Sequence, residues 1–340
     1  MADSGIPIID FAPFYGSDGV AKASLVEEVG QACKGTGFFQ LINHGIPLRL
    51  QKAVLKASAE FFSLPSDTKE LYNKDIGGFN RGYERLRAQN FEKRTAGDLK
   101  EGYYFGVDLP ENHPKVVTKT FGLGPNKYPQ HVQDPAQFRK TIDTYFDSMR
   151  LLAENIVRIL CQTLDIPDDW VSGFAHEPIA VLRLLHYPPQ APDASELERG
   201  IGAHTDFGAV TILLQDMIGG LQVWNREKHE WRDVEPTEDA LVVNLGNLMM
   251  RWTNDKYLSN LHRVINKSGE ERYSVPFFFS GSPDFLVKCF SPCEDVQDGA
   301  KYTPIRVGDW IAGRYADTYG TSEAKAMREL SVAEAKAGIV

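Results

Sequence analysis

The sequence is poor in cysteine and has no long uninterrupted apolar run. Only four cysteines occur among 340 residues, too few for a disulfide framework in a chain of this length. No segment stays apolar for the roughly 20 residues that a membrane-spanning helix needs. The first residues, MADSGIPIIDF, also lack the basic and apolar regions of a secretion signal. We therefore expect a cytoplasmic protein that does not insert into membranes.

Positive charge is also scarce. Lysine and arginine number 37 against 46 aspartates and glutamates, which gives a formal net charge of -9 at pH 7. No extended lysine- or arginine-rich block occurs, although such a block is what attracts nucleic acids and anionic membrane surfaces. We therefore expect a small-molecule partner and neither nucleic acid nor a membrane. The sequence does not determine the oligomeric state.

The distribution of apolar residues indicates a globular α+β chain whose later part is mainly β. Helical spacing of apolar residues predicts helices over 23–37, 48–65 and 134–164, the last of them about eight turns long. Beyond residue 178, short strand-like runs are separated by Gly, Pro, Asn and Asp. This pattern is typical of an antiparallel sandwich or barrel.

These patterns divide the chain into four regions of one folding unit. They predict an N-terminal α/β region over 1–130, a long supporting helix within 131–177, a strand-rich core over 178–285, and a C-terminal strand and helical lid over 286–340. No internal repeat or low-complexity segment interrupts them.

His204 and Asp206 stand two residues apart in the segment GIGAHTDFGAVTILLQD. In extended backbone, residues i and i+2 point to the same side, so both side chains can reach one ion. Alone, such a pair is more often a turn or a buried hydrogen bond. His262 begins a later strand-like run, and two histidines with one carboxylate form the ligand set of many non-haem Fe(II) oxygenases.

Arg272 and Ser274 are also two residues apart. By the same alternation they share a strand face with Pro276 and Phe278, which predicts a guanidinium and a hydroxyl directed into the core. A buried arginine needs an anionic partner, and its planar fork fits a carboxylate. An iron site beside an Arg/Ser pair fits an enzyme that binds 2-oxoglutarate.

The ordered set HTD at 204–206, His262 after 55 intervening residues and RYS at 272–274 resembles the iron(II)- and 2-oxoglutarate-dependent dioxygenases of the isopenicillin N synthase-like branch. The segments IPIIDF, GFFQLINHGIP, NRGY, KEGYYFG and RLLHYPPQ extend the resemblance over nearly the whole chain. It implies a distorted double-stranded β-helix, also called a jelly roll, with an α-rich N-terminal region and a C-terminal helix.

The resemblance also implies roles for individual residues. Fe(II) would be held by His204, Asp206 and His262, and 2-oxoglutarate by Arg272, Ser274 and Tyr187. O2 is the second co-substrate, and ascorbate is an optional reductant. The chain departs from many relatives at Leu185, where they carry an asparagine that can donate a hydrogen bond. Arg183 would compensate if its side chain points inward.

Candidate substrate residues rest on position alone. Phe207 follows the aspartate ligand, and Trp252 lies in NLMMRWTND, although aromatic residues on strands are more often core residues. Family position adds a further set that we expect to line the substrate pocket: Arg81, Tyr83, Tyr103 and Phe105. A C-terminal lid would direct Tyr315 and Tyr319 inward.

The expected function is oxidation of a small organic metabolite, with release of succinate and CO2. Hydroxylation is the main expectation, and desaturation or rearrangement requires only a different fate of the substrate. Segments such as GGLQVWN look more like microbial members of the family, fungi among them, than plant ones, which favours specialised metabolism or nucleobase oxidation.

Two alternatives remain at this stage. An Fe(II) oxidase that uses no 2-oxoglutarate would keep the three metal ligands, and Leu185 is the residue that favours it. A non-catalytic small-molecule binding protein would have lost a ligand, whereas His204, Asp206 and His262 are all present.

Overall fold

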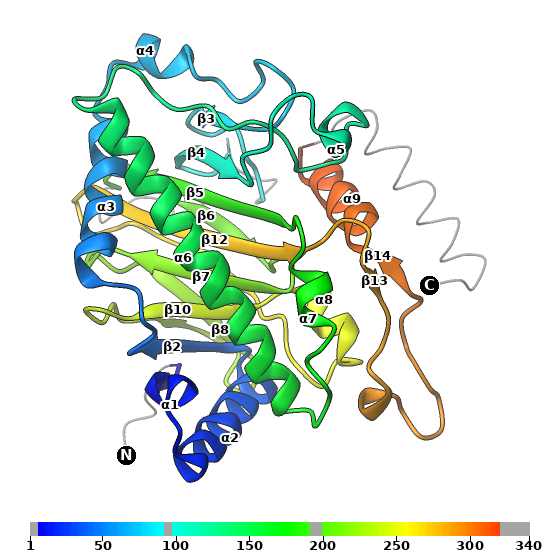
Figure 1. Cartoon of the computed structure of the whole chain (residues 1–340). Helices are drawn as coiled ribbons and strands as arrows, with labels where there is room; N and C mark the ends of the chain where they lie inside the picture. Colours follow the sequence, from blue (N-terminus) through cyan, green and yellow to red (C-terminus); the bar gives the residue numbers. More distant parts are fainter. Residues whose placement is uncertain (1–5, 92–96, 191–198, 320–340) are drawn as a thin grey trace.

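Two sheets form the centre of the fold (Figure 1). The computed structural model describes residues 6–91, 97–190 and 199–319, with side chains in the last helix described as far as residue 316. In spatial order the larger sheet consists of β1 (Ile8–Asp10), β2 (Phe38–Ile42), β10 (Leu241–Leu245), β7 (Val210–Gln215), β12 (Arg272–Gly281), β5 (Ile179–Tyr187), β4 (Glu101–Gly106) and β3 (Gly82–Glu84). The smaller sheet consists of β6 (Ile201–His204), β11 (His262–Val264), β8 (Leu221–Asn225) and β9 (Glu230–Asp233). Side chains of both sheets line one cavity, as expected for a jelly roll.

Helices and a small hairpin surround the sheets. The hairpin pairs β13 (Leu286–Val287) with β14 (Ile305–Arg306). The helices are α1 (Ala12–Tyr15), α2 (Gly19–Gly35), α3 (Leu48–Phe62), α4 (Ser66–Glu70), α5 (Pro114–Val117), α6 (Pro135–Gln162), α7 (Val171–Phe174), α8 (Asn247–Trp252) and α9 (Val307–Tyr319), with a 3-10 turn at Ser291–Cys293. In the described part of the chain, no helix has both the length and the apolar character needed to cross a bilayer.

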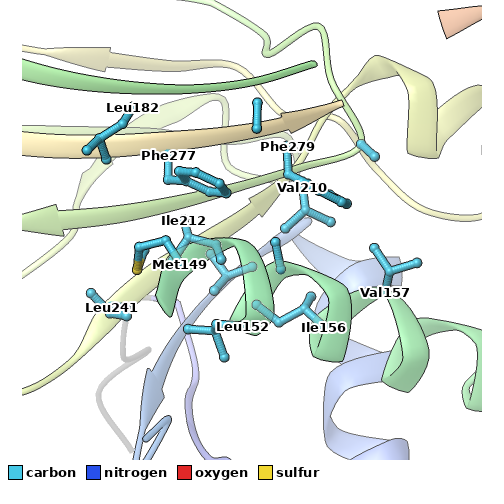
Figure 2. Packing of buried hydrophobic residues seen from close by; sticks show 14 of the residues in the cluster. Met149, Leu152, Ile156, Val157, Leu182, Val210, Ile212, Leu241, Phe277 and Phe279 are labelled. Carbon is cyan, nitrogen blue, oxygen red and sulfur yellow. The ribbon is translucent and has the colours of Figure 1, made fainter. Parts of the chain in front are cut away.

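Helix α6 supports the larger sheet. It begins at Pro135, whose fixed φ suits the first helical position, and the Asp134 side chain accepts a hydrogen bond from the Gln137 amide. Figure 2 shows its buried face against the sheet. The labelled contacts of this core are Met149, Leu152, Ile156 and Val157 of α6 with Leu182, Val210, Ile212, Leu241, Phe277 and Phe279. The helix predicted over 134–164 is confirmed.

Strand β12 is buried on both faces because its alternate side chains meet different partners. Val275, Phe277 and Phe279 belong to the core that includes α6. Arg272, Ser274, Pro276 and Phe278 line the cavity between the sheets. The period-two prediction for this strand is therefore confirmed, and the sheet separates an apolar core from a partly polar cavity.

The N-terminal region joins the same sheet at both edges. Strand β2 pairs with β10 at one side, and β4 pairs with β5 at the other. All four cysteines of the chain are buried and unpaired, so no disulfide holds these parts together. Hydrogen-bonded strands and the shared core join them instead.

Candidate functional site

Three potential metal ligands converge at the edge of the smaller sheet. His204 ends β6 and His262 begins β11, and these two residues are direct partners in the antiparallel pairing. Asp206 follows β6 by two residues. Its Oδ1 lies 3.8 Å from His204 Nε2 and 3.7 Å from His262 Nε2. One ligand atom from each residue lies within 4.8 Å of the others, so a single ion can contact all three.

The hydrogen bonds of Asp206 leave one carboxylate oxygen directed at the histidines. Its Oδ2 accepts hydrogen bonds from Thr211 Oγ1 and Asn244 Nδ2, both at 2.7 Å. Thr211 and Asn244 face each other across the β7–β10 pairing. Because Oδ2 is fixed by two donors, Oδ1 is held in position toward the two Nε2 atoms.

The two imidazoles are oriented by backbone carbonyls. The Nδ1 atoms of His204 and His262 lie 2.9 and 3.2 Å from the carbonyl oxygens of Gly202 and Asn260. An Nδ1–H that donates to each carbonyl leaves Nε2 as a lone-pair donor, the tautomer that a metal requires. The Phe91 ring stacks on the His204 ring with centroids 4.5 Å apart, which fixes its plane further.

Burial and mutual charge keep these ligands in their metal-binding forms. Burial, followed by the repulsion from His262, lowers the pKa of His204 to about 3. Burial would raise the pKa of Asp206, but the histidines and the hydrogen bonds from Asn244 and Thr211 outweigh it and lower that pKa. At neutral pH the site therefore holds a neutral imidazole beside a carboxylate, without protons that a metal would have to displace.

Arg272 provides a buried cation on the cavity wall. Its Nε donates to the Gly219 carbonyl, its Nη2 donates to Gln215 Oε1 at 3.1 Å, and its guanidinium lies over the Tyr187 ring, 4.7 Å from the centroid. Its side chain is fully buried, yet Nη1 has no hydrogen-bond partner among the described residues. An unsatisfied buried donor is costly, so this site fits an anionic ligand.

Ser274 and Tyr187 extend this anion site. Arg272 pairs with Tyr187 across the β12–β5 ladder, and Ser274 Oγ donates to the Tyr187 hydroxyl at 3.5 Å. All three side chains line the same cavity as the His/Asp/His cluster. The chemistry of these donors fits one carboxylate of a 2-oxoglutarate molecule whose other end reaches the metal.

Two of the substrate residues expected from the sequence line this cavity. Arg183 and Phe207 are part of its wall, and so is Leu185, the position at which the chain departs from many relatives. Phe207 is tied to the C-terminal helix because Trp310 Nε1 donates to its carbonyl at 2.8 Å.

Tyr103 and Phe105 do not line the cavity, which corrects the sequence-based expectation. Both lie on the other face of β4, where Tyr103 packs 4.6 Å from Phe61 and Phe105 packs 6.4 Å from Phe138. The residue between them, Tyr104, points to the opposite face. The expectation rested on family position alone, which does not show which side chains of β4 face the cavity.

Arg81 and Tyr83 are likewise structural and do not form part of the cavity wall. Arg81 is buried and donates to the Gly122 carbonyl at 2.6 Å and to Asn126 Oδ1 at 3.1 Å. Tyr83 donates its hydroxyl proton to Glu101 Oε2 at 2.6 Å. These bonds hold the loops before and after β4, a role that local sequence does not distinguish from substrate contact.

Trp252 is also a core residue. Its ring packs 5.2 Å from Trp170 and 5.4 Å from Phe290, and it lies outside the cavity wall. The side chain of Tyr319, the last residue of α9, lies outside the described part of the chain. Tyr315, expected to face inward with it, does line the cavity.

Several residues of the site were not identified from the sequence. They are Thr211 and Asn244, which hold Asp206, and Phe38, Gln89 and Phe91 in the cavity wall. The only signal was a polar residue within an apolar strand, as in ALVVNLG and AVTILL. Such residues are common in cores, so the signal becomes specific only when the strands are paired.

Comparison with known proteins identifies the family. A model described as the 2OG-Fe(II) oxygenase superfamily matches residues 178–281, and one described as the N-terminal region of a non-haem dioxygenase in morphine synthesis matches residues 6–131. The 2-oxoglutarate-Fe(II) type oxidoreductase hxnY of Emericella nidulans is 48% identical over 325 residues, covering 95% of this chain and 93% of that protein. The 2-oxoglutarate-dependent dioxygenase citB of Monascus ruber is 42% identical over 290 residues, 83% of this chain and 87% of that one.

A solved structure agrees with these relatives. The crystal structure of a full-length Neurospora crassa protein in complex with alpha-KG and thymine superposes with a TM-score of 0.81 at 28% identity, covering 92% of this chain and 96% of that one. The predicted jelly roll, cofactors and reaction class are therefore confirmed, and the two alternatives, a 2-oxoglutarate-independent oxidase and a non-catalytic binding protein, are not supported. The chain belongs to the 2OG-Fe(II) oxygenase superfamily and is a non-haem iron(II)- and 2-oxoglutarate-dependent oxygenase that oxidises a small organic metabolite.

Proposed function

We propose that His204, Asp206 and His262 hold the iron and that Arg272, Ser274 and Tyr187 bind the distal end of 2-oxoglutarate. The observation that carries the proposal is a fully buried arginine whose Nη1 has no hydrogen-bond partner in the described part of the chain, in the cavity that also contains the three metal ligands. A carboxylate would satisfy that donor, and the Ser274 hydroxyl lies two residues away on the same strand face.

When bound, iron and 2-oxoglutarate supply the oxidising chemistry, in which O2 and 2-oxoglutarate give succinate and CO2 while the substrate is oxidised. The protein orients both reactants. Thr211 and Asn244 fix Asp206, and backbone carbonyls fix both imidazoles. This preorganisation means that the ligands need little rearrangement when the reactants bind.

We propose further that the substrate is a small, flat metabolite. Phe207 and Phe278 lie on the cavity wall with Arg183, so an apolar ring can bind beside a cation. The Neurospora crassa structure similar to this chain contains thymine, a planar ring, which supports this size and shape. The fungal relatives named as dioxygenases, such as citB, fit a role in specialised metabolism.

An anaerobic titration tests the site assignment. Metal-free protein receives Fe(II) and then 2-oxoglutarate, and we expect the visible charge-transfer absorption of an iron-bound keto acid. Arg272→Gln removes the buried cation, so the 2-oxoglutarate concentration for half-saturation should rise by about 30-fold or more. Fe(II) binding itself should remain.

The matched control is Arg139→Gln, because this arginine lies on α6 with its side chain 56% exposed. It should leave the titration unchanged. If Arg272→Gln titrates like the unmodified protein, the carboxylate site lies elsewhere. If Fe(II) still binds tightly to His204→Ala, the metal assignment is wrong.

A further inference from the structure

Arg183 lies in the wall of the cavity that also contains the metal ligands and the Arg272 site. Its guanidinium carbon is 4.5 Å from the centroid of Tyr104 and 4.8 Å from that of Phe278. Its Nη2 donates to the Tyr315 hydroxyl at 3.0 Å. Side chains from β4, β12 and α9 therefore hold the planar group in one orientation on the wall of the cavity.

The strand register places this group beyond 2-oxoglutarate. Along the β5–β12 ladder, Ser274 pairs with Leu185, whereas Phe278 pairs with Val181. Four residues of strand separate Ser274 from Phe278, about 13 Å at roughly 3.3 Å per residue. A 2-oxoglutarate bound as proposed has one carboxylate at Ser274 and its keto-acid end at the iron, so both of its ends are accounted for. Arg183 therefore faces the space that remains for the prime substrate.

The surroundings of Arg183 are rich in positive charge. Behind Tyr104, the Glu84 carboxylate accepts the tyrosine hydroxyl at 2.7 Å and pairs with Lys74 and Lys100, each at 3.0 Å. Burial would raise the pKa of Glu84, but Lys100, Lys74 and Arg183 outweigh it and hold that pKa below its ordinary value. This carboxylate is thus shared among Lys74, Lys100 and Arg183.

We infer that Arg183 is a specificity-determining residue that binds a carboxylate attached to an aromatic or heteroaromatic ring of the prime substrate. This inference rests on the proposed function, because it takes the Arg272 site as occupied by 2-oxoglutarate. A guanidinium held flat between two rings offers its edge to a carboxylate in the same plane. The substrate ring then lies against Phe278 and Phe207, beside Arg183 on the cavity wall.

Binding of matched acid and amide probes tests the inference without turnover. The protein is loaded with Mn(II) and saturating 2-oxoglutarate, which blocks the Arg272 site, and is titrated calorimetrically under anaerobic conditions. The probes are indole-3-carboxylate against indole-3-carboxamide, and benzoate against benzamide. We expect at least one pair to show about tenfold or greater preference for the acid, the size of one charge-assisted interaction.

Arg183→Gln should abolish that preference, and Arg183→Lys, which keeps the charge, should retain part of it. Tyr315→Phe removes the hydroxyl that accepts from Arg183 and should weaken the preference without removing it. The exposed-arginine control Arg139→Gln should match the unmodified protein. The 2-oxoglutarate affinity, measured in each preparation, should be the same for all four variants.

The outcomes separate this inference from the proposed function. If no pair shows a preference in the unmodified protein, or if Arg183→Gln keeps the preference, the substrate role of Arg183 is overturned while the 2-oxoglutarate assignment stands. A loss of 2-oxoglutarate affinity in Arg183→Gln also overturns the inference, because Arg183 would then serve the co-substrate. If the unmodified protein fails to bind 2-oxoglutarate, the proposed function fails and this inference fails with it.

Discussion

At the scale of single residues, the two oxygens of Asp206 have different roles. Oδ1 faces the Nε2 atoms of both histidines, and Oδ2 is held by Thr211 and Asn244. A carboxylate with one oxygen held by hydrogen bonds loses less conformational entropy when its other oxygen binds a metal than a freely rotating carboxylate does. The polar residues that hold it therefore belong to the metal site although they do not reach the ion.

Thr211→Val tests this role because it removes the hydroxyl and nearly keeps the shape. We expect the affinity for Mn(II), a redox-stable substitute for Fe(II), to fall by about 10- to 100-fold. Calorimetric titration of the metal-free protein measures the change. Thr118→Val, at an exposed threonine, is the control and should bind as before. Equal affinity in Thr211→Val would mean that Asp206 needs no support from β7.

Residues with a fixed spacing were predictable from the sequence, and residues defined by pairing were not. His204 and Asp206 fall on one side of extended backbone by local geometry alone. Asn244 meets Asp206 only because β10 lies beside β7, a pairing between segments about 30 residues apart. Likewise, Tyr103 was chosen and Tyr104 was not, because local sequence does not show which face of β4 meets the core.

At the scale of elements, β5 has a different function on each face. Arg183, Leu185 and Tyr187 line the cavity. On the opposite face His186 pairs with Glu101 of β4, with Nδ1 and Oε1 2.8 Å apart, and its Nε2 contacts Glu271. Its contacts place it in an ion-paired cluster that joins β4 to β5.

This cluster predicts a pH dependence of stability. Burial lowers the pKa of His186, but Glu101 and Glu271 outweigh it and raise that pKa above the ordinary 6.5. A raised folded-state pKa means that the folded protein binds the proton more tightly. The stabilisation of the fold by this bound proton is therefore complete below about pH 6.5 and is lost as the pH rises through the raised pKa of His186.

The measurement is the thermal midpoint of the unmodified protein and of His186→Gln from pH 6 to pH 9. We expect the midpoint of the unmodified protein to decline over this range more steeply than that of the variant. His176→Gln, at an exposed histidine, should follow the unmodified protein. Parallel curves for His186→Gln and the unmodified protein would show that the proton on His186 does not stabilise the fold.

Long elements were predictable from the sequence, whereas short ones were not. The α6 helix has its own cap at Asp134 and an apolar stripe over many turns, so its limits are set locally. The region 66–130 contains short elements such as α4, β3 and α5. Their ends are set by distant bonds, among them those from Arg81 to Gly122 and Asn126, which no local pattern shows.

At the scale of the whole molecule, the regions distinguished in the sequence share one core, and the strands of 1–130 and 178–285 share one sheet. Strand β2 pairs with β10, about 200 residues later, and α6 packs against strands β7 and β12 as well as helices α2 and α3. The resemblance to a family predicted the jelly roll, but this edge-to-edge continuity depends on pairings that composition and periodicity do not specify. We propose that the four regions unfold as one unit.

Ile156→Ala tests this cooperativity because Ile156 is fully buried on α6 against the sheet (Figure 2). The space left by the smaller side chain should lower the free energy of unfolding by about 2 to 5 kcal/mol.

Two spectroscopic signals report different parts of the chain. All five tryptophans lie at or after residue 170, so their fluorescence reports that part of the chain. Far-UV circular dichroism is dominated by helices such as α2, α3 and α6. Urea unfolding followed by both signals should give coincident transitions that shift together in the variant. Leu151→Ala, at a 60% exposed position of the same helix, should shift neither. A substitution in a shared core must destabilise everything that packs on it. If circular dichroism alone shifts, α6 and the N-terminal helices therefore unfold independently of the jelly roll.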